Sequence, residues 1–243
     1  MKKFFIVISL LLVIFCSFGF VFLGLMARGS DDNYFNTHWR QWFSRVPVWR
    51  YVLSLHYDGD GREDFIGSGY GRIVVEVYGM DGLSIDSELM QSVADRIQGI
   101  TKKPTSVVFS NVAIPYVPLV RAEDVLQIAR QYRRSSVDRD TAGLYVLFAS
   151  AKEEEPTLLG STYQEDGIIL YVDAMKDFTR NAPETFGSYV VATILHEFGH
   201  QISLQHNDQP DCLMNEHAEA NHTAKNNPSD VVVDFCEYEL GGL

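Results

Sequence analysis

Residues 196–206 read H-E-F-G-H-Q-I-S-L-Q-H, from His196 to His206, and contain the pattern H-E-x-x-H-x-x-S-x-x-H. On an α-helix, His196 and His200 leave the same face one turn apart. Two neutral imidazole nitrogens at this spacing can reach one zinc ion at about 2.0–2.1 Å. Glu197 is rotated by about 100° from His196, so it lies beside the metal, where a general base for a water is needed.

The third histidine predicts the end of the helix. His206 lies six residues beyond His200, so on a continuing helix it would point away from the metal. We therefore expect the helix to end near Ser203 and the chain to turn back, which brings His206 to the metal. Three protein ligands leave a fourth position open for water, as catalytic zinc sites do. The alternative interpretation is a metal-free helix of the protein core.

A methionine follows the third histidine, in Asp211-Cys212-Leu213-Met214-Asn215. Three histidines in this pattern followed by such a methionine resemble the metzincin clan of zinc metallopeptidases. Within that clan the chain is most similar to the archaemetzincins, which carry Cys-x-Met-Asn and later Phe-Cys-x-x-Cys. Here the second motif reads Phe235-Cys236-Glu237-Tyr238-Glu239. The resemblance covers about residues 72–239 and implies that Met214 forms a turn beneath the metal.

The chain departs from the archaemetzincin pattern at several positions. Ser203 replaces a glycine, and Glu216 stands where the clan has a tyrosine. Asn207 and Glu239 occupy the positions of two of the four cysteines that hold a second, structural zinc in archaemetzincins. We therefore expect one zinc here, not two. If the domain lies outside the cytoplasm, the proximity that the resemblance implies for Cys212 and Cys236 suits a disulfide between them. Two reduced, buried cysteines in a cytoplasm-facing domain are the alternative.

Strand and helix patterns alternate between residues 72 and 172. Strands are expected at 72–80, 105–112 and 142–149, helices at 87–99 and 123–134, and a hairpin at 158–163 and 168–172. Helical crossovers between strands indicate a mainly parallel sheet. With the resemblance, this predicts a metzincin-like α+β fold: a twisted, mainly parallel sheet packed on the active-site helix. The resemblance also implies an antiparallel edge strand that binds substrate, formed by Leu158, Leu159, Gly160, Ser161 and Thr162.

An apolar run from Phe4 to Ala27 follows Lys2 and Lys3. As a helix it would be about 36 Å long, enough for a bilayer core of about 30 Å. The run is longer than the apolar region of a cleavable signal, so we expect a single-pass membrane anchor. The two lysines favour a cytoplasmic N-terminus, with the rest of the chain extracytoplasmic. Cleavage near residues 17–19 would instead yield a secreted protein.

The sequence divides into an anchor or signal (1–27), a juxtamembrane linker (28–50) and one domain (51–243). Aromatic residues recur at helical spacing in the linker, which predicts either a helix at the membrane interface or one packed on the domain. Residues 48–57 and 65–70 have β-like patterns. Between them, Asp58-Gly59-Asp60-Gly61-Arg62-Glu63-Asp64 suggests a hairpin turn or, less favoured, a calcium loop.

The net charge of −12 argues against nucleic acid as a partner, because nothing here builds a basic groove. The apolar run predicts a membrane anchor, and the resemblance implies a peptidase acting on peptides or proteins. In it a zinc-bound water attacks the peptide carbonyl and Glu197 takes the proton. Two other functions remain open: a membrane-anchored metal-binding protein without turnover, and a zinc hydrolase of a non-peptide amide. Rival third ligands are Glu216, His217 and His222, and the last lies in a glycosylation sequon at 221–223.

Overall fold

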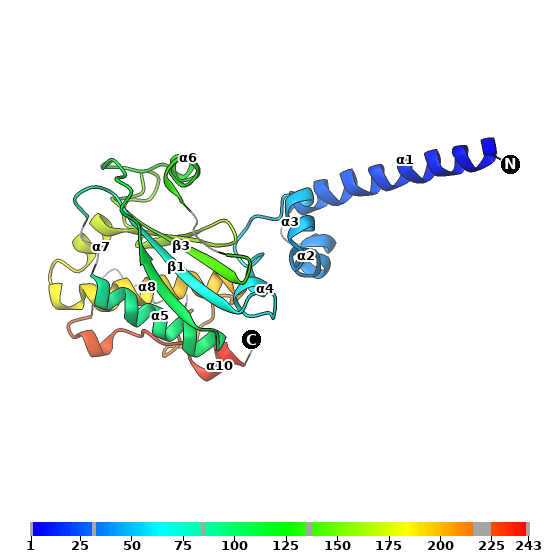
Figure 1. Ribbon diagram of the computed structural model, residues 1–243. Coiled ribbons are helices and arrows are strands. Elements are labelled where there is room, and N and C mark those ends of the chain that lie inside the picture. The colour runs from blue at the N-terminus through cyan, green and yellow to red at the C-terminus, as the bar shows by residue number, and fades with distance from the viewer. Residues whose placement is uncertain (1, 31–32, 84–85, 135–137, 216–224, 242–243) are drawn as a thin grey trace.

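The computed structural model describes residues 2–30, 33–83, 86–134, 138–215 and 225–241. A five-stranded sheet with strand order β2-β1-β3-β5-β4 lies at the centre of the large domain (Figure 1). The strands are β1 (Arg72–Gly79), β2 (Thr105–Phe109), β3 (Thr141–Ala149), β4 (Gly160–Tyr163) and β5 (Gly167–Tyr171). All pairs are parallel except β4 with β5, so the predicted mixed sheet with an antiparallel edge strand is confirmed. The edge strand begins at Gly160, and Leu158 and Leu159 precede it.

The two faces of the sheet bury separate hydrophobic clusters, because successive side chains of a strand point in opposite directions. Along β3, Val146 and Phe148 belong to one cluster, whereas Tyr145 and Leu147 belong to the other. The first cluster is closed by α5 (Ser87–Thr101) and α8 (Phe186–Gln201), and the second by α6 (Ala122–Tyr132) (Figure 1). The sheet therefore has the active-site helix on one face only.

Helix α8 is apolar on most sides, as a helix between a sheet and other elements must be. Val190, Ile194 and Phe198, spaced four apart, are all buried. The helix follows α7 (Val172–Phe178) and η2 (Pro183–Thr185), which lead from the end of β5. After α8 the chain continues through η3 (Pro228–Asp230) to α10 (Glu237–Leu240).

The N-terminal part is helical. Helix α1 (Lys2–Ala27) projects away from the domain, and η1 (Phe35–Trp39), α2 (Arg40–Ser44) and α3 (Pro47–Leu53) lie at its base (Figure 1). Residues 8–27 of α1 have a mean hydropathy of 2.6 and are long and apolar enough to cross a membrane. The linker helices pack on α1 through a small cluster that includes Ala27, Phe35 and Leu53.

The β prediction for residues 48–57 and 65–70 is wrong: α3 occupies most of the first segment, and in the second α4 (Arg62–Phe65) ends and a turn follows. Pro47 begins α3, where its missing N–H costs nothing, and α3 buries Arg50 and Leu53 three residues apart on one side. The hairpin turn between the two segments is therefore absent as well. Asp60 and Asp64 form ion pairs with Arg40 and Arg50, which accounts for these two carboxylates without calcium.

Candidate metal centre and active site

Three imidazole rings converge at the end of α8. The Nε2 atom of His206 lies 3.1 Å from the Nε2 atoms of both His196 and His200. Nitrogens that share a tetrahedral zinc at about 2.0–2.1 Å are about 3.3 Å apart, so the donor set and its spacing fit this ion. His196 is buried and His206 is exposed, which leaves the site open to solvent on the side of His206. The structure thus brings together the three predicted ligands.

Two backbone carbonyl groups orient the rings. His196 Nδ1 lies 2.9 Å from the carbonyl oxygen of Leu213, and His200 Nδ1 lies 3.3 Å from that of Leu204. A carbonyl oxygen only accepts, so each Nδ1 carries the proton and each Nε2 keeps a lone pair for a metal. Burial, together with the neighbouring His196 and His206, lowers the pKa of His200 to about 4. His200 is therefore neutral near pH 7, as a ligand must be.

The turn after α8 ends the helix where the sequence predicts. Ser203 adopts a left-handed conformation with φ of 67°, which places it at the position usually taken by glycine. Its N–H donates to the carbonyl of His200, and the N–H of Leu204 donates to that of Gly199, both at 2.9 Å. This pair of bonds is a Schellman motif, and it reverses the chain so that His206 returns toward His200.

Met214 lies directly beneath the helix, between the histidines and the C-terminal segment. A Cβ atom added to Gly199 would stand 2.4 Å from Met214 Sδ and 3.0 Å from Phe235 Cε1. Only glycine allows this approach, because any side chain would displace the methionine or the helix. The N–H of Asn207 donates to the carbonyl of Met214 at 2.8 Å, so the methionine turn also holds the segment that carries His206.

Cys212 and Cys236 form the predicted disulfide, which ties the C-terminal segment to the methionine turn. Beside it, Glu239 is only 4% exposed and accepts a hydrogen bond from the side chain of Asn207 at 2.9 Å. The two residues that replace cysteines of the archaemetzincin pattern therefore bind each other. The sequence alone did not predict this partnership, because 32 residues separate Glu239 from Asn207.

Glu197 is buried on α8, next to β4. A Cβ atom added to Gly160 would lie 2.4 Å from Thr193 Cγ2 and 3.4 Å from Glu197 Cγ. Glycine in a strand often marks such a close approach, and here it lets the edge strand pass against the helix at Glu197. The candidate base, the candidate ligands and the candidate substrate strand are thus neighbouring parts of one site.

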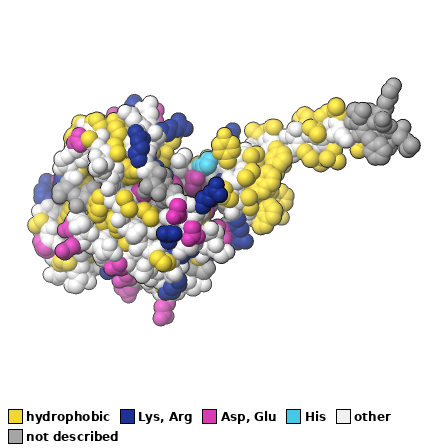
Figure 2. Space-filling model, viewed as in Figure 1, with side chains coloured by type: hydrophobic (Ala, Val, Ile, Leu, Met, Phe, Trp, Pro, Cys, Tyr) yellow, Lys and Arg dark blue, Asp and Glu magenta, His cyan; other side chains and the backbone are white. Residues whose placement is uncertain are grey.

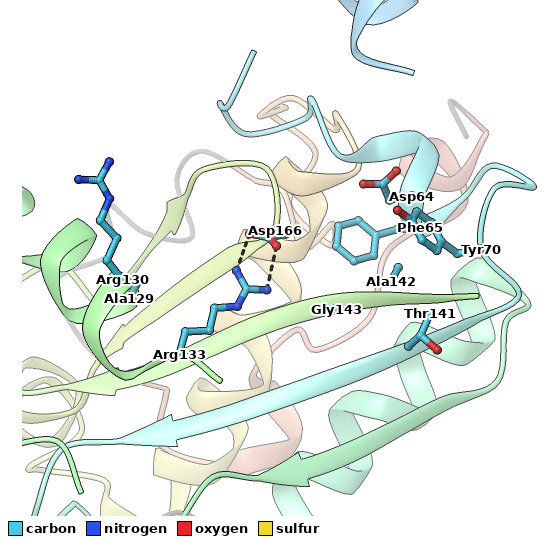
Figure 3. A pocket seen from close by; sticks show the side chains of 10 residues that line it. All are labelled: Asp64, Phe65, Tyr70, Ala129, Arg130, Arg133, Thr141, Ala142, Gly143 and Asp166. Atoms are coloured by element: carbon cyan, nitrogen blue, oxygen red, sulfur yellow. Dashed lines mark hydrogen bonds and ion pairs between the residues drawn. The ribbon is translucent and has the colours of Figure 1, made fainter. Parts of the chain in front are cut away.

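A hollow at one end of the sheet contains none of these residues. It lies at the amino end of β3, where Arg133 makes two hydrogen bonds to Asp166 (Figure 3). Asp64, Phe65 and Tyr70 line its opposite wall. Arg133 and Asp166 are paired there and Asp64 pairs with Arg50, so we assign the chemistry to the histidine site.

Residues 156–238, which contain the histidines, the methionine turn and Glu197, match the model of peptidase family M54. The protein is a zinc metallopeptidase. This confirms the resemblance inferred from the sequence, and it favours a peptidase over the two alternative functions. No curated protein sequence matches the chain of this metallopeptidase.

Two solved structures are similar to this metallopeptidase. The archaemetzincin of Methanopyrus kandleri is 16% identical with a TM-score of 0.51, and the likeness covers 70% of this chain and 93% of that one. Metalloproteinase-II of Bacteroides fragilis is 12% identical with a TM-score of 0.44, over 72% of this chain and 53% of that one. The first likeness shows a shared fold.

Some sequence predictions lie outside the described residues. They are the alternative third ligands Glu216, His217 and His222, and the glycosylation sequon at 221–223.

Proposed function

We propose that this metallopeptidase holds one catalytic zinc ion with His196, His200 and His206 and hydrolyses peptide bonds with Glu197 as general base. The convergence of three Nε2 atoms, two of them 3.1 Å from the third, carries the proposal. Zinc bound there would supply a Lewis acid that polarises the peptide carbonyl and lowers the pKa of a water. Glu197 accepts the proton of the attacking water and passes it to the leaving amine.

The edge strand β4 is the proposed substrate-binding element. One edge of β4 pairs with β5, so the other edge offers backbone groups to an extended peptide. Because Gly160 lies against Glu197, a peptide added there would run past the proposed base. Leu158 and Leu159 precede the strand and extend this edge, since the carbonyl of Leu159 accepts from the N–H of Tyr171 at 2.9 Å.

The proposal includes a membrane anchor. Helix α1 is long and apolar enough to span a bilayer, and Lys2 and Lys3 favour a cytoplasmic N-terminus. The catalytic domain, residues 51–243, then lies outside the cytoplasm, where the disulfide is stable. Co-sedimentation with membranes after a carbonate wash tests the anchor, and protease protection in sealed vesicles tests the orientation.

Peptide hydrolysis by the full chain in detergent tests the chemistry. We expect a chelator to abolish cleavage of a peptide library and added zinc to restore it. Glu197→Ala should keep bound zinc, because Glu197 neighbours a ligand without being one, and should lose about 10²–10⁴-fold in rate. Near wild-type hydrolysis by zinc-loaded Glu197→Ala protein would refute the assigned role.

A further inference from the structure

The helices at the base of α1 expose apolar faces, and we call residues 34–53 the aromatic collar. Val48, Tyr51 and Val52 lie on one side of α3, at i, i+3 and i+4, and are 50–81% exposed. Trp39 and Trp42, three residues apart, are 46% and 62% exposed. Figure 2 shows hydrophobic side chains continuing from α1 onto this region. An exposed patch of this kind indicates a binding surface.

The polar side of the collar faces the catalytic domain. Arg40 pairs with Asp60 at 2.7 Å, and Arg50 pairs with Asp64 at 2.6 Å. Asp60 is buried, and Arg40 also donates to the carbonyl of Ala27 at the end of α1. The collar is therefore amphipathic: its charged groups fasten it to the domain and to α1, and its aromatic groups remain outside.

The position of the collar along α1 matches the surface of a bilayer. A hydrocarbon core of about 30 Å takes about 20 helical residues at 1.5 Å each, so a span that starts at Phe4 ends near Leu23. Trp49 stacks on Phe20 with ring centroids 5.3 Å apart, and Leu23 packs against the buried cluster beneath the collar. The collar thus lies where the hydrocarbon core gives way to headgroups.

The three arginines of the collar, Arg40, Arg45 and Arg50, pair with Asp60, Glu63 and Asp64 of the domain. The exposed side of the collar is therefore left to its aromatic and aliphatic groups. Tryptophan and tyrosine favour the membrane–water interface, because each ring has an apolar body and a polar group.

We propose that the aromatic collar lies in the headgroup region of the bilayer and holds the catalytic domain at a set orientation to the membrane surface. The proposal rests on the proposed membrane anchor and adds that the domain keeps one orientation to the bilayer. A fixed orientation would favour substrates presented at the membrane surface over peptides free in solution.

The three tryptophans of the chain, Trp39, Trp42 and Trp49, all belong to the collar, so tryptophan fluorescence reports on it alone. The full chain is reconstituted in phosphatidylcholine vesicles whose acyl chains carry bromine near the headgroup or near the bilayer centre. We expect strong quenching by the shallow bromines and weaker quenching by the deep ones. A variant with Trp39→Phe and Trp49→Phe isolates Trp42, and Trp42→Phe controls for it.

Unquenched fluorescence from protein that floats with the vesicles would overturn the collar proposal while leaving the anchor intact. Failure to float would instead refute the anchor. A collar buried in a dimer would also overturn the proposal. In that case the tryptophans of crosslinked dimers would stay unquenched, and quenching would appear only when the protein is diluted in lipid so that the dimers dissociate. In the same vesicles, Tyr51→Ser should weaken quenching of Trp42, whereas Tyr238→Ser, an exposed tyrosine far along the chain, should not.

A second inference rests on the carboxylate of Glu239. Its Oε1 atom accepts from the N–H of Met214 at 2.6 Å and from Asn207 Nδ2 at 2.9 Å. Its Oε2 atom accepts from the N–H of Cys236 at 2.9 Å and from that of Leu213 at 3.3 Å. One buried carboxylate thus collects four donors from three separate segments.

These donors belong to the segments that carry the histidines. The carbonyl of Leu213 orients His196, and its N–H is held by Glu239. The carbonyl of Met214 holds the N–H of Asn207, which follows His206, and Glu239 binds the side chain of the same Asn207. Two of the three ligand positions are therefore connected to one carboxylate.

We infer that Glu239 is a positioning residue that sets the zinc affinity of the site through the methionine turn and Asn207. Loss of a residue that orients metal ligands typically weakens binding by about 10–100-fold. The inference rests on the proposed histidine ligands, and its readout is zinc binding rather than activity.

Glu239→Gln provides the test, because an amide keeps the shape but offers one acceptor oxygen and sets N–H groups against N–H donors. Zinc affinity is measured by competition with a fluorescent chelator on the full chain in detergent. We expect weakening of about 10–100-fold, and no change for the control Glu237→Gln, which is exposed on the same short helix. At saturating zinc, hydrolysis by the variant should recover.

A structural role alone would lower the melting temperature of metal-free protein without a change in zinc affinity. Unchanged affinity in folded Glu239→Gln protein would therefore overturn the inference. If that variant does not fold, Asn207→Ala removes a single donor and should weaken zinc binding by a smaller factor. An unchanged affinity there would overturn the inference equally. Zinc binding retained by a variant that lacks His196, His200 and His206 would instead refute the proposed ligands.

Discussion

Ser203 occupies a conformation that suits glycine better. A left-handed residue other than glycine costs about 1–2 kcal/mol. The structure offers a partial compensation, because Ser203 Oγ donates to the carbonyl of Gly59 at 3.2 Å. Gly59 itself has a φ of 81°, and a Cβ added there would meet Ser203 Oγ at 2.8 Å. The hydrogen bond of Ser203 to the loop before α4 therefore offsets part of its backbone strain.

This balance predicts opposite signs for two substitutions. Ser203→Gly removes the strain and a hydrogen bond worth about 0.5–1.5 kcal/mol, so it should leave stability unchanged or raise it by up to about 1 kcal/mol. Ser203→Ala keeps the strain and loses the bond, and should destabilise. Thermal melts of zinc-loaded protein compare the two. Clear destabilisation by glycine would show that the contact with Gly59 outweighs the strain.

At the scale of elements, the site depends on how closely β4 approaches α8. Gly160 permits the approach, since a Cβ there would overlap the Thr193 methyl group at 2.4 Å. The position of Glu197 relative to the edge strand follows from this contact. A strand that could not come so near would separate the proposed base from the peptide.

Gly160→Ala should therefore destabilise by about 1–3 kcal/mol and lower peptide hydrolysis, because overpacking pushes β4 from α8. Thr193→Ser removes the opposing methyl group and should restore both stability and activity in the double variant. Gly99→Ala in α5, where a Cβ meets nothing within 4 Å, is the control and should be neutral or stabilising. Melts and hydrolysis rates of the four proteins measure these effects. A double variant no better than Gly160→Ala would mean that Thr193 is not the obstacle.

The C-terminal segment is a second element that completes the site, because the disulfide joins it to the methionine turn. Thiol counting on non-reduced full chain in denaturant should find one thiol, that of Cys16. Replacing Cys212 and Cys236 by serine opens a loop closed over 24 residues and should cost about 3 kcal/mol. Three titratable thiols would show that the bridge does not form.

At the scale of the whole molecule, ion pairs connect the N-terminal helices to the catalytic domain. Arg40 and Asp60 are 15% and 3% exposed at their side chains, so water screens them little. Arg62 continues the connection, because its Nη1 donates to the carbonyl of Ile202 at 2.8 Å in the turn after α8. The segment that carries Asp60, Arg62 and Asp64 therefore links the N-terminal helices to the turn between two proposed zinc ligands.

Arg40→Ala should leave the buried Asp60 unpaired and lower the free energy of unfolding by about 3 kcal/mol. The matched control is Arg180→Ala. Arg180 pairs with Asp177, and the two side chains are 72% and 73% exposed. That exposed pair should contribute less than about 1 kcal/mol. Denaturant titration of the full chain in detergent measures both. Equal effects of the two substitutions would show that the connection adds no stability.

Local patterns in the sequence determined much of this protein. The spacing of His196 and His200 depends only on the helical repeat, and the alternation of strands and helices from residue 72 to 172 follows from periodicity. The chain reversal at Ser203 was predictable because His206 could not reach the metal on a continuing helix. These features need no knowledge of distant contacts.

Tertiary structure decided the rest. Residues 48–57 have a short apolar pattern that suits strand or helix equally. The helix α3 forms because it buries Leu53 against α1 and pairs Arg50 with Asp64. The roles of Gly160 and Glu239 also depend on partners far along the chain, Thr193 for one and Asn207 for the other. Such contacts leave no periodic signal, because packing between separate elements fixes which side chains meet.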